Sequence, residues 1–230
     1  MNNHFVIIVA AGTGSRMGTE IPKQFLELHR LPVLMQTIMK FENSKTRPQI
    51  LVVLAENMII YWKELCEKYS FEIPHHICSG GNTRFSSVKN GLNFIQENSE
   101  SSESFKIAVH DAARPLLSVE LIDSLYNECN FEKPAIIPAV QSTNSVRIGN
   151  QEKSEAIDRN QVWLVQTPQV FQSDLLISSY EQEENNLFTD DASVVEKMSN
   201  NLFLFPGENK NIKITHEEDL IVAHYLFNKT

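Results

Sequence analysis

The sequence predicts an α/β fold built around a mostly parallel β-sheet. Two observations indicate it: short apolar runs rich in Val and Ile have the length of buried strands, and segments with apolar residues at helical spacing separate them. The expected strands are residues 5–10, 50–55, 106–110 and 135–140. The expected helices are residues 31–42, 57–70, 83–98 and 119–130. Because strands and helices alternate, consecutive strands are expected to run parallel.

Length and composition are typical of one globular domain. The chain has 230 residues, of which 42% are hydrophobic and 21% charged, so it can bury a sizeable core. We expect a single domain over residues 1–230. The N-terminus runs straight into a predicted strand without a signal-peptide pattern, and no apolar run approaches the ~18 residues that span a bilayer. A cytoplasmic protein without membrane contact is therefore expected.

Charge and cysteine content exclude further classes. The formal net charge of −9 argues against nucleic acid as a partner, because affinity for a phosphate backbone depends on clustered Lys and Arg. The three cysteines are odd in number and form no C-x-x-C pair, so neither a disulfide framework nor a zinc site is supported.

A glycine-rich turn, AAGTGSRMG at residues 10–18, directly follows the first predicted strand. Such a turn lets backbone N–H groups approach phosphates closely, and Arg16 and Lys23 add positive charge. The turn lacks the Gly-Lys-Ser/Thr end of a P-loop and the G-x-G-x-x-G spacing of a dinucleotide fingerprint. The sequence therefore indicates a nucleotide site suited to chemistry at phosphorus; an ordinary strand-to-helix turn is the alternative.

Asp111 follows another buried strand, within HDAARP at residues 110–115. Open α/β sheets place ligands at the carboxyl ends of their strands, and Mg²⁺ uses one or two carboxylates together with substrate phosphates. Asp111 is thus the candidate Mg²⁺ ligand. The alternative is a helix N-cap, with Arg114 as its structural partner.

A second glycine turn, GGNTRFSSV at residues 80–88, opens a predicted helix. Its backbone is suited to reading the edge of a base, and Ser87 with Arg84 to holding ribose or phosphate. Near the C-terminus, Lys213 lies between two Ile residues in a strand-like run at 212–214, where a buried lysine needs an anion. Thr215 and Glu218 fit a capping box ahead of a helix at 219–227, and residues 189–193 fit a capped helix start.

Residues 141–167 interrupt the alternation of strand and helix. Two β-like runs, 145–148 and 162–167, flank a polar segment and predict a projecting hairpin-like arm. An arm that cannot cover its own apolar side favours a partner subunit; a long functional loop is the alternative. Thr143, Arg159 and Thr167 on or beside it supply donors suited to a phosphate monoester.

Taken together, the motifs resemble those of the 2-C-methyl-D-erythritol 4-phosphate cytidylyltransferase family. They are AAGxGxRM at 10–17, PKQ at 22–24, GGxxRxxSV at 80–88, HDAARP at 110–115, DR at 158–159, TPQ at 167–169, TD at 189–190 and NIKIT at 211–215. They occur in the expected order across nearly the whole chain. The resemblance implies a three-layer, Rossmann-like nucleotidyltransferase with a mixed, mostly parallel sheet, working as a homodimer whose β-arms reach the neighbour's site.

The resemblance also implies a reaction and roles for residues. CMP is transferred from CTP to 2-C-methyl-D-erythritol 4-phosphate, and pyrophosphate is released. Asp111 binds Mg²⁺, and Arg16 and Lys23 are the cations of the transition state. CTP is contacted by Ala10, Ala11, Gly12, Gly81, Asn82, Ser87 and Ala112. The sugar phosphate is held by Thr167 and Lys213 of one chain and by Thr143 and Arg159 of its partner.

Two departures and two rival functions stay open. Many relatives carry Asp where this chain has Asn82, so a side-chain contact to the cytosine amino group changes from carboxylate to amide. The arm keeps Thr143 but lacks the charged neighbours of some relatives.

A ribitol or other pentitol phosphate cytidylyltransferase shares most motifs, although Ala113 favours methylerythritol phosphate, since ribitol relatives tend to carry Val there. A non-catalytic CTP sensor is the rival from another class.

Overall fold

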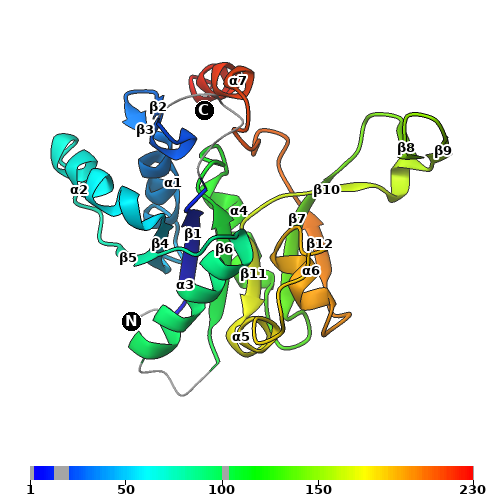
Figure 1. Ribbon diagram of the computed structural model, residues 1–230, viewed down its shortest axis with the longest axis horizontal. Helices are drawn as coiled ribbons and strands as arrows, with labels where there is room; N and C mark the ends of the chain where they lie inside the picture. The colour runs from blue at the N-terminus through cyan, green and yellow to red at the C-terminus, as the bar shows by residue number, and fades with distance from the viewer. Residues whose placement is uncertain (1–2, 13–20, 100–103, 230) are drawn as a thin grey trace.

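The computed structural model describes residues 3–12, 21–99 and 104–229, and it has an α/β architecture with an arm that projects from the body (Figure 1). The strands are β1 Phe5–Ala10, β2 Glu27–Leu28, β3 Leu31–Pro32, β4 Gln49–Leu54, β5 His76–Ser79, β6 Lys106–Asp111, β7 Ala135–Gln141, β8 Val146–Gly149, β9 Ser154–Ile157, β10 Trp163–Val165, β11 Gln169–Gln172 and β12 Phe203–Pro206. The helices are α1 Val33–Glu42, α2 Ile59–Lys68, α3 Arg84–Asn98, α4 Val119–Glu128, α5 Ser173–Ser179, α6 Asp191–Glu196 and α7 Glu217–Phe227, with short 3₁₀ helices η2 Lys23–Phe25, η3 Glu56–Met58 and η4 Arg159–Gln161.

The central sheet is mixed and mostly parallel, as predicted. In the described part of the chain it has eight strands in the order β10-β7-β11-β6-β1-β4-β5, and β12 pairs with β7. β1 runs parallel to both β4 and β6, and β11 runs antiparallel to β6 and β7. The register places Val9 beside Asp111. The first glycine turn and the Asp111 carboxylate therefore leave the sheet at the same level of its carboxyl-terminal edge.

Helices cover both faces of the sheet and make three layers. On one face, alternate residues of β1 such as Val6 and Ile8 pack with α1, α2 and α4 around the fully buried Trp62. On the other face, Ile7 packs with α3, α5 and α6. This alternation is the two-residue period of a strand buried on both sides. A third, smaller core joins α7 to the carboxyl-terminal edge through Ala113, Ile214 and Ala223.

Several predicted elements shift at their ends. The helix expected at 31–42 begins at Val33, because Leu31 and Pro32 form the short strand β3. The strand-like run at 212–214 is not a strand. Ahead of α7, the Asp219 carboxylate accepts hydrogen bonds from the backbone N–H groups of Thr215 and His216, so the capping box predicted one residue earlier is wrong. The helix start predicted at 189–193 is confirmed, with Asp190 as the N-cap of α6.

The arm is a hairpin, but its strands differ from those predicted. The predicted run at 145–148 corresponds to β8, but β8 pairs with β9, a strand that was not predicted. The predicted run at 162–167 contains β10, which returns to the body and pairs with β7. Most residues of β8, β9 and β10 are exposed, including Ile148 and Leu164. Figure 1 shows the hairpin standing well away from the sheet and its helices.

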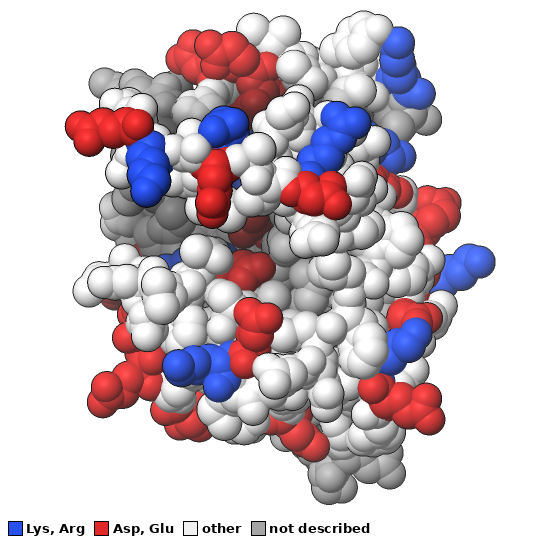
Figure 2. Space-filling model, turned by 90° about the vertical axis from the view of Figure 1, so that its right-hand side faces the viewer, with Lys and Arg blue, Asp and Glu red and all other residues white. Residues whose placement is uncertain are grey.

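Charged residues, cysteines and helix length describe the surface and the chemistry available on it. On the side from which the arm projects, Lys and Arg lie singly among acidic and uncharged residues (Figure 2). Cys66, Cys78 and Cys129 are free thiols. Among the described residues, no helix combines the length and apolar content that crossing a bilayer requires.

Candidate nucleotide site

A cavity of about 360 Å³ lies over the carboxyl-terminal ends of β1, β5 and β6. This edge of an open α/β sheet is where ligands bind. All seven residues for which the resemblance implies contact with CTP line the cavity: Ala10, Ala11, Gly12, Gly81, Asn82, Ser87 and Ala112. Lys23, Asp111 and Lys213 line it as well. The predicted Arg16 lies outside the described residues.

The turn after β1 is held by Gln24, a residue to which the sequence analysis gave no role. Its side-chain amide donates to the carbonyl oxygens of Ala10 at 2.7 Å and Gly12 at 3.0 Å. Gln24 is 3% exposed and lies in the 3₁₀ helix that carries Lys23. The amide therefore ties the glycine turn to the segment that brings Lys23 to the cavity. The only signal in the sequence was its place directly after Lys23.

The second glycine turn lies against the first. A Cβ on Gly80 would come within 2.6 Å of the Ala11 Cβ, so only glycine permits this approach. The Ser87 hydroxyl accepts from the Gly81 N–H at 3.1 Å and donates to the Thr83 carbonyl at 2.7 Å. Ser87 thus shapes the turn from the first turns of α3, and it also lines the cavity.

Asp111, the last residue of β6, is surrounded by three cations. Its Oδ2 lies 2.8 Å from Lys213 Nζ and 3.5 Å from Arg114 Nε, and its Oδ1 lies 3.6 Å from Arg84 Nε. Burial alone would raise the pKa of this carboxyl, but the three cations hold the pKa well below its usual value. The alternative interpretation as a helix N-cap is wrong, because α4 begins at Val119 with Ser118 as its cap. Lys213 was expected to be buried and paired with an anion. The anion is Asp111, but the lysine is only partly buried, with 38% of its side chain exposed.

Thr167 supports Asp111 from inside the protein. Its hydroxyl accepts from the Asp111 N–H at 3.0 Å and lies 3.0 Å from His110 Nδ1. His110 Nε2 faces the Arg114 carbonyl at 3.2 Å, and a carbonyl only accepts, so Nε2 carries the proton and Nδ1 accepts from Thr167. Burial lowers the pKa of His110 to about 3, which keeps the ring neutral. Thr167 is 4% exposed and does not line the cavity; its contact with a sugar phosphate stays a prediction.

Arg84 forms an ion pair with Asp191, which was not predicted from the sequence. It was expected to hold ribose or phosphate with Ser87, but its Nη1 and Nη2 donate to the Asp191 carboxylate at 2.9 and 2.5 Å. Burial favours a neutral guanidine, but Asp191 and Asp111 outweigh it and raise the pKa of Arg84. These partners are 107 residues apart in the chain, and no local pattern signals such a pair.

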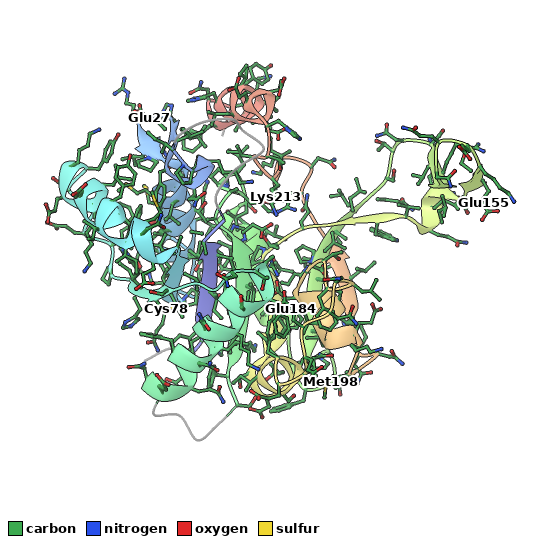
Figure 3. The ribbon with its side chains drawn as sticks, viewed as in Figure 1. Glu27, Cys78, Glu155, Glu184, Met198 and Lys213 are labelled. Atoms are coloured by element: carbon green, nitrogen blue, oxygen red, sulfur yellow. The ribbon has the colours of Figure 1, made fainter. Side chains whose placement is uncertain are left out.

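The segment that carries Lys213 is fixed by backbone contacts instead of strand pairing. Arg114 Nη1 donates to the Asn211 carbonyl at 2.9 Å, and the Ile214 N–H donates to the Ala113 carbonyl at 2.9 Å. Asn211 Nδ2 donates to the Thr167 carbonyl at 2.9 Å. Lys213, labelled in Figure 3, is therefore held over the carboxyl-terminal edge of the sheet.

The two predicted arm residues, Thr143 and Arg159, do not line the nucleotide cavity. Arg159 Nη1 donates to the Thr143 carbonyl at 3.1 Å, and both residues are exposed. Thr143 lines a different cavity, of about 570 Å³, with Trp163 and Leu204. In Figure 3 the arm residue Glu155 is far from Lys213. Within one chain, the structure does not bring the predicted arm residues to the nucleotide cavity.

The side chains around the cavity are suited to a metal ion held by a single carboxylate. In the part of the chain that the structure describes, no three His, Cys, Asp or Glu side chains gather into a metal-binding cluster. Asp111 lines the cavity, and the contact of its Oδ1 at 3.6 Å with Arg84 Nε is too long for an ordinary hydrogen bond. A single ionised carboxylate with one oxygen available suits a cation that takes its other ligands from phosphates and water, as Mg²⁺ does.

The protein has a three-layer α/β fold, and one edge of its sheet brings together backbone amides, cations and one carboxylate. This combination places it among the Rossmann-like enzymes that act on nucleotides. Comparison with known proteins makes the class specific. The model of the family described as 2-C-methyl-D-erythritol 4-phosphate cytidylyltransferase matches residues 4–229. The chain belongs to this family, as the motifs predicted.

Individual relatives agree over nearly their whole length. The chain is 46% identical to 2-C-methyl-D-erythritol 4-phosphate cytidylyltransferase of Phocaeicola vulgatus, over 98% of this chain and 100% of the relative. It is 45% identical to the protein of the same name from Bacteroides fragilis, over 96% and 97%. The crystal structure of the Francisella tularensis protein of that name superposes with a TM-score of 0.79 at 33% identity, covering 97% and 99%.

Proposed function

We propose that this protein transfers CMP from CTP to 2-C-methyl-D-erythritol 4-phosphate, releasing pyrophosphate and forming the cytidine diphosphate derivative of the sugar alcohol. Membership of the family supports the reaction. The observation that carries the proposal is the convergence of all seven predicted nucleotide contacts, together with Lys23 and Asp111, on one cavity.

The chemistry requires charge placement more than proton transfer. An oxygen of the acceptor phosphate attacks the α-phosphorus of CTP, and the bond from that phosphorus to the oxygen bridging the β-phosphorus breaks. The nucleophile is already an anion, so no general base is needed. The task of the protein is to align two polyanions and to stabilise charge on the pentacoordinate phosphorus. We assign this stabilisation to Lys23, which lines the cavity, and to Arg16.

The triphosphate and the base have separate supports. The turn that Gln24 ties in place offers backbone amides near Gly12 for the phosphates. We assign the cytosine edge to the turn at Gly81 and Asn82, because this turn borders the same cavity and its backbone is fixed by Ser87. Asn82 supplies an amide where many relatives supply a carboxylate.

We assign Asp111 as the residue that holds Mg²⁺. The ion, when bound, neutralises phosphate charge and polarises the α-phosphate. Asp111 is suited to this role because its pKa is depressed, it lines the cavity, and its Oδ1 is only approached by Arg84 at 3.6 Å. Lys213 now pairs with the other oxygen of that carboxylate, so the ammonium is positioned to meet an acceptor phosphate beside the nucleotide.

We further propose that two copies of the chain complete the acceptor site. Thr167 and Lys213 would act from one chain, and Thr143 and Arg159 from the arm of a second copy. Exposed apolar residues at the base of the arm support this assembly: Trp163 is 42%, Leu164 52% and Leu204 51% exposed. A monomer gains nothing from exposing such a patch, whereas a dimer interface buries it.

Pyrophosphate release measured with CTP, UTP and ATP tests the proposal. With methylerythritol phosphate as acceptor, CTP should give turnover and the other nucleotides little. A parallel assay with ribitol 5-phosphate separates the rival substrate. Ala113 is 4% exposed and packed in the small core under α7, so that side of the cavity has a fixed shape. Absence of turnover with every pairing would favour the CTP sensor instead.

A further inference from the structure

Arg84 lies between two carboxylates and contacts them unequally. Its Nη1 and Nη2 donate to both oxygens of Asp191, at 2.9 and 2.5 Å. Its Nε lies 3.6 Å from Asp111 Oδ1, beyond ordinary hydrogen-bond distance. The outer edge of the guanidinium is therefore fully paired, and its inner N–H only approaches Asp111.

Asp191 is held in one orientation. It is the first residue of α6 and is fully buried, with 0% of the residue exposed. Tyr180 Oη donates to its Oδ1 at 2.7 Å, in addition to the two bonds from Arg84. The Tyr180 ring is itself fixed by stacking on Phe85, with ring centroids 4.7 Å apart. A bidentate pair with these supports fixes both the direction and the reach of Arg84.

This arrangement spares one oxygen of Asp111. Oδ2 is taken by Lys213 at 2.8 Å and approached by Arg114, whereas among the described residues the charged group near Oδ1 is Arg84 Nε. Without Asp191, the fork of Arg84 would be able to turn toward Asp111 and pair with both oxygens, the geometry that guanidinium and carboxylate prefer. Asp111 would then have no oxygen left for another ligand.

We propose that Asp191 is a positioning residue for the metal site: it holds Arg84 by its outer edge and so keeps Asp111 Oδ1 open to a divalent cation. The inference rests on the proposed function, because it takes Asp111 as the carboxylate that receives Mg²⁺. Asp191 does not line the cavity; it acts through Arg84 alone.

Mn²⁺ binding to the full-length protein tests this inference apart from activity. Electron paramagnetic resonance of free Mn²⁺, titrated in the presence of CTP, gives the half-saturating concentration. Asp191→Asn should raise it at least about tenfold, as loss of groups that orient a metal ligand does. In an Arg84→Gln background the same substitution should have little effect, because the side chain that would capture Asp111 is absent.

Asp190→Asn is the matched control. It removes one negative charge at the same helix start, Asn is an equally good N-cap, and Asp190 contacts Gln169 and Ser193 instead of Arg84. Its half-saturating Mn²⁺ should equal that of the unaltered protein. Unchanged Mn²⁺ binding in Asp191→Asn, or an equal loss in both variants, would overturn the proposal.

Tyr180→Phe covers the case in which Asp191→Asn does not fold. It keeps the ring stack and removes one bond to Asp191, so it should weaken Mn²⁺ binding about threefold; unchanged binding there would equally reject the idea. Pyrophosphate release by the unaltered protein is measured in parallel. If the unaltered protein releases no pyrophosphate, the proposed function is rejected. If it releases pyrophosphate normally but the substitutions leave Mn²⁺ binding unchanged, only the role of Asp191 is rejected.

Discussion

The nucleotide edge of the sheet and the arm hold their functional residues in opposite ways. At the edge, Asp111 and Thr167 are buried and bonded to groups from several elements. On the arm, Thr143 and Arg159 are exposed, and the contact that joins them lies within the arm itself. The comparison teaches that one chain alone preorganises the nucleotide half of the site, whereas the acceptor half proposed for the arm would depend on what the arm meets.

The largest effect is expected at the nucleotide edge. Lys23→Ala should lower kcat by about 10²–10³-fold, because it removes a cation aimed at charge that develops in the transition state. The fold should persist, since Lys23 contributes to no apolar core. Steady-state pyrophosphate release and thermal unfolding measure the two quantities. Lys63→Ala, at an exposed lysine of α2, is the control, and near-normal turnover in Lys23→Ala would remove the catalytic assignment.

The second prediction sharpens the comparison by separating the two halves of the site. Lys23→Ala and Arg159→Ala should each be nearly inactive alone. When the two variants are unfolded and refolded together, half of the proposed dimers should be mixed, and each mixed dimer should have one intact site. Activity should therefore return to about a quarter of normal. If the mixture stays inactive while each variant is dimeric by light scattering, the arm does not serve the neighbouring chain.

The third prediction compares two threonines. Thr167→Val removes the hydroxyl that accepts from Asp111 and donates to His110, leaving both groups without that partner. The free energy of unfolding should fall by about 2 kcal/mol in urea titrations. Thr143→Val, at an exposed arm position, should change it by less than about 0.5 kcal/mol. Equal losses at the two positions would contradict the contrast between a preorganised edge and an open arm.

The smallest effect concerns pH. Burial lowers the pKa of His110 from 6.5 to about 3. Between these values the unfolded chain binds a proton that the folded protein does not, so stability is lost as pH falls below about 6.5. The loss approaches ~1.4 kcal/mol per pH unit for one such group. His4 and His75 also have pKa values lowered by burial, so His110→Gln should reduce the slope measured by urea unfolding between pH 7 and 5, not abolish it. An unchanged slope in that variant would show that His110 does not contribute.

The sequence predicted those parts of the fold whose signals are local. β1 and β6 are apolar runs, and their ends carry the glycine turn and Asp111, so both the strands and the edge they share followed from pattern alone. β9 was missed because it is short and carries no alternating apolar pattern: Ser154 and Glu155 are polar, and three of its four residues are exposed. The run at 212–214 was expected to pair because Ile alternates with Lys, but those Ile side chains pack under α7 instead.

The parts of the site that escaped prediction depend on contacts between distant segments. Gln24 was visible only as a neighbour of Lys23, and its bonds to the glycine turn emerge only when η2 packs beside β1. The pairing of Arg84 with Asp191 joins the starts of two helices on one face of the sheet. Thr167 was predicted to contact the sugar phosphate, which stays a prediction, and its sequence context did not reveal that its hydroxyl bonds to Asp111 and His110.

The contact between the two glycine turns limits how this protein can diverge. A methyl group at position 80 would collide with Ala11 and would lie 2.9 Å from the hydroxyl oxygen of Ser87, and both of those residues border the cavity. Gly80 itself does not border it. Selection for nucleotide binding therefore reaches a position that never meets the nucleotide, and a lineage could gain a larger side chain there only by remodelling both neighbours at once.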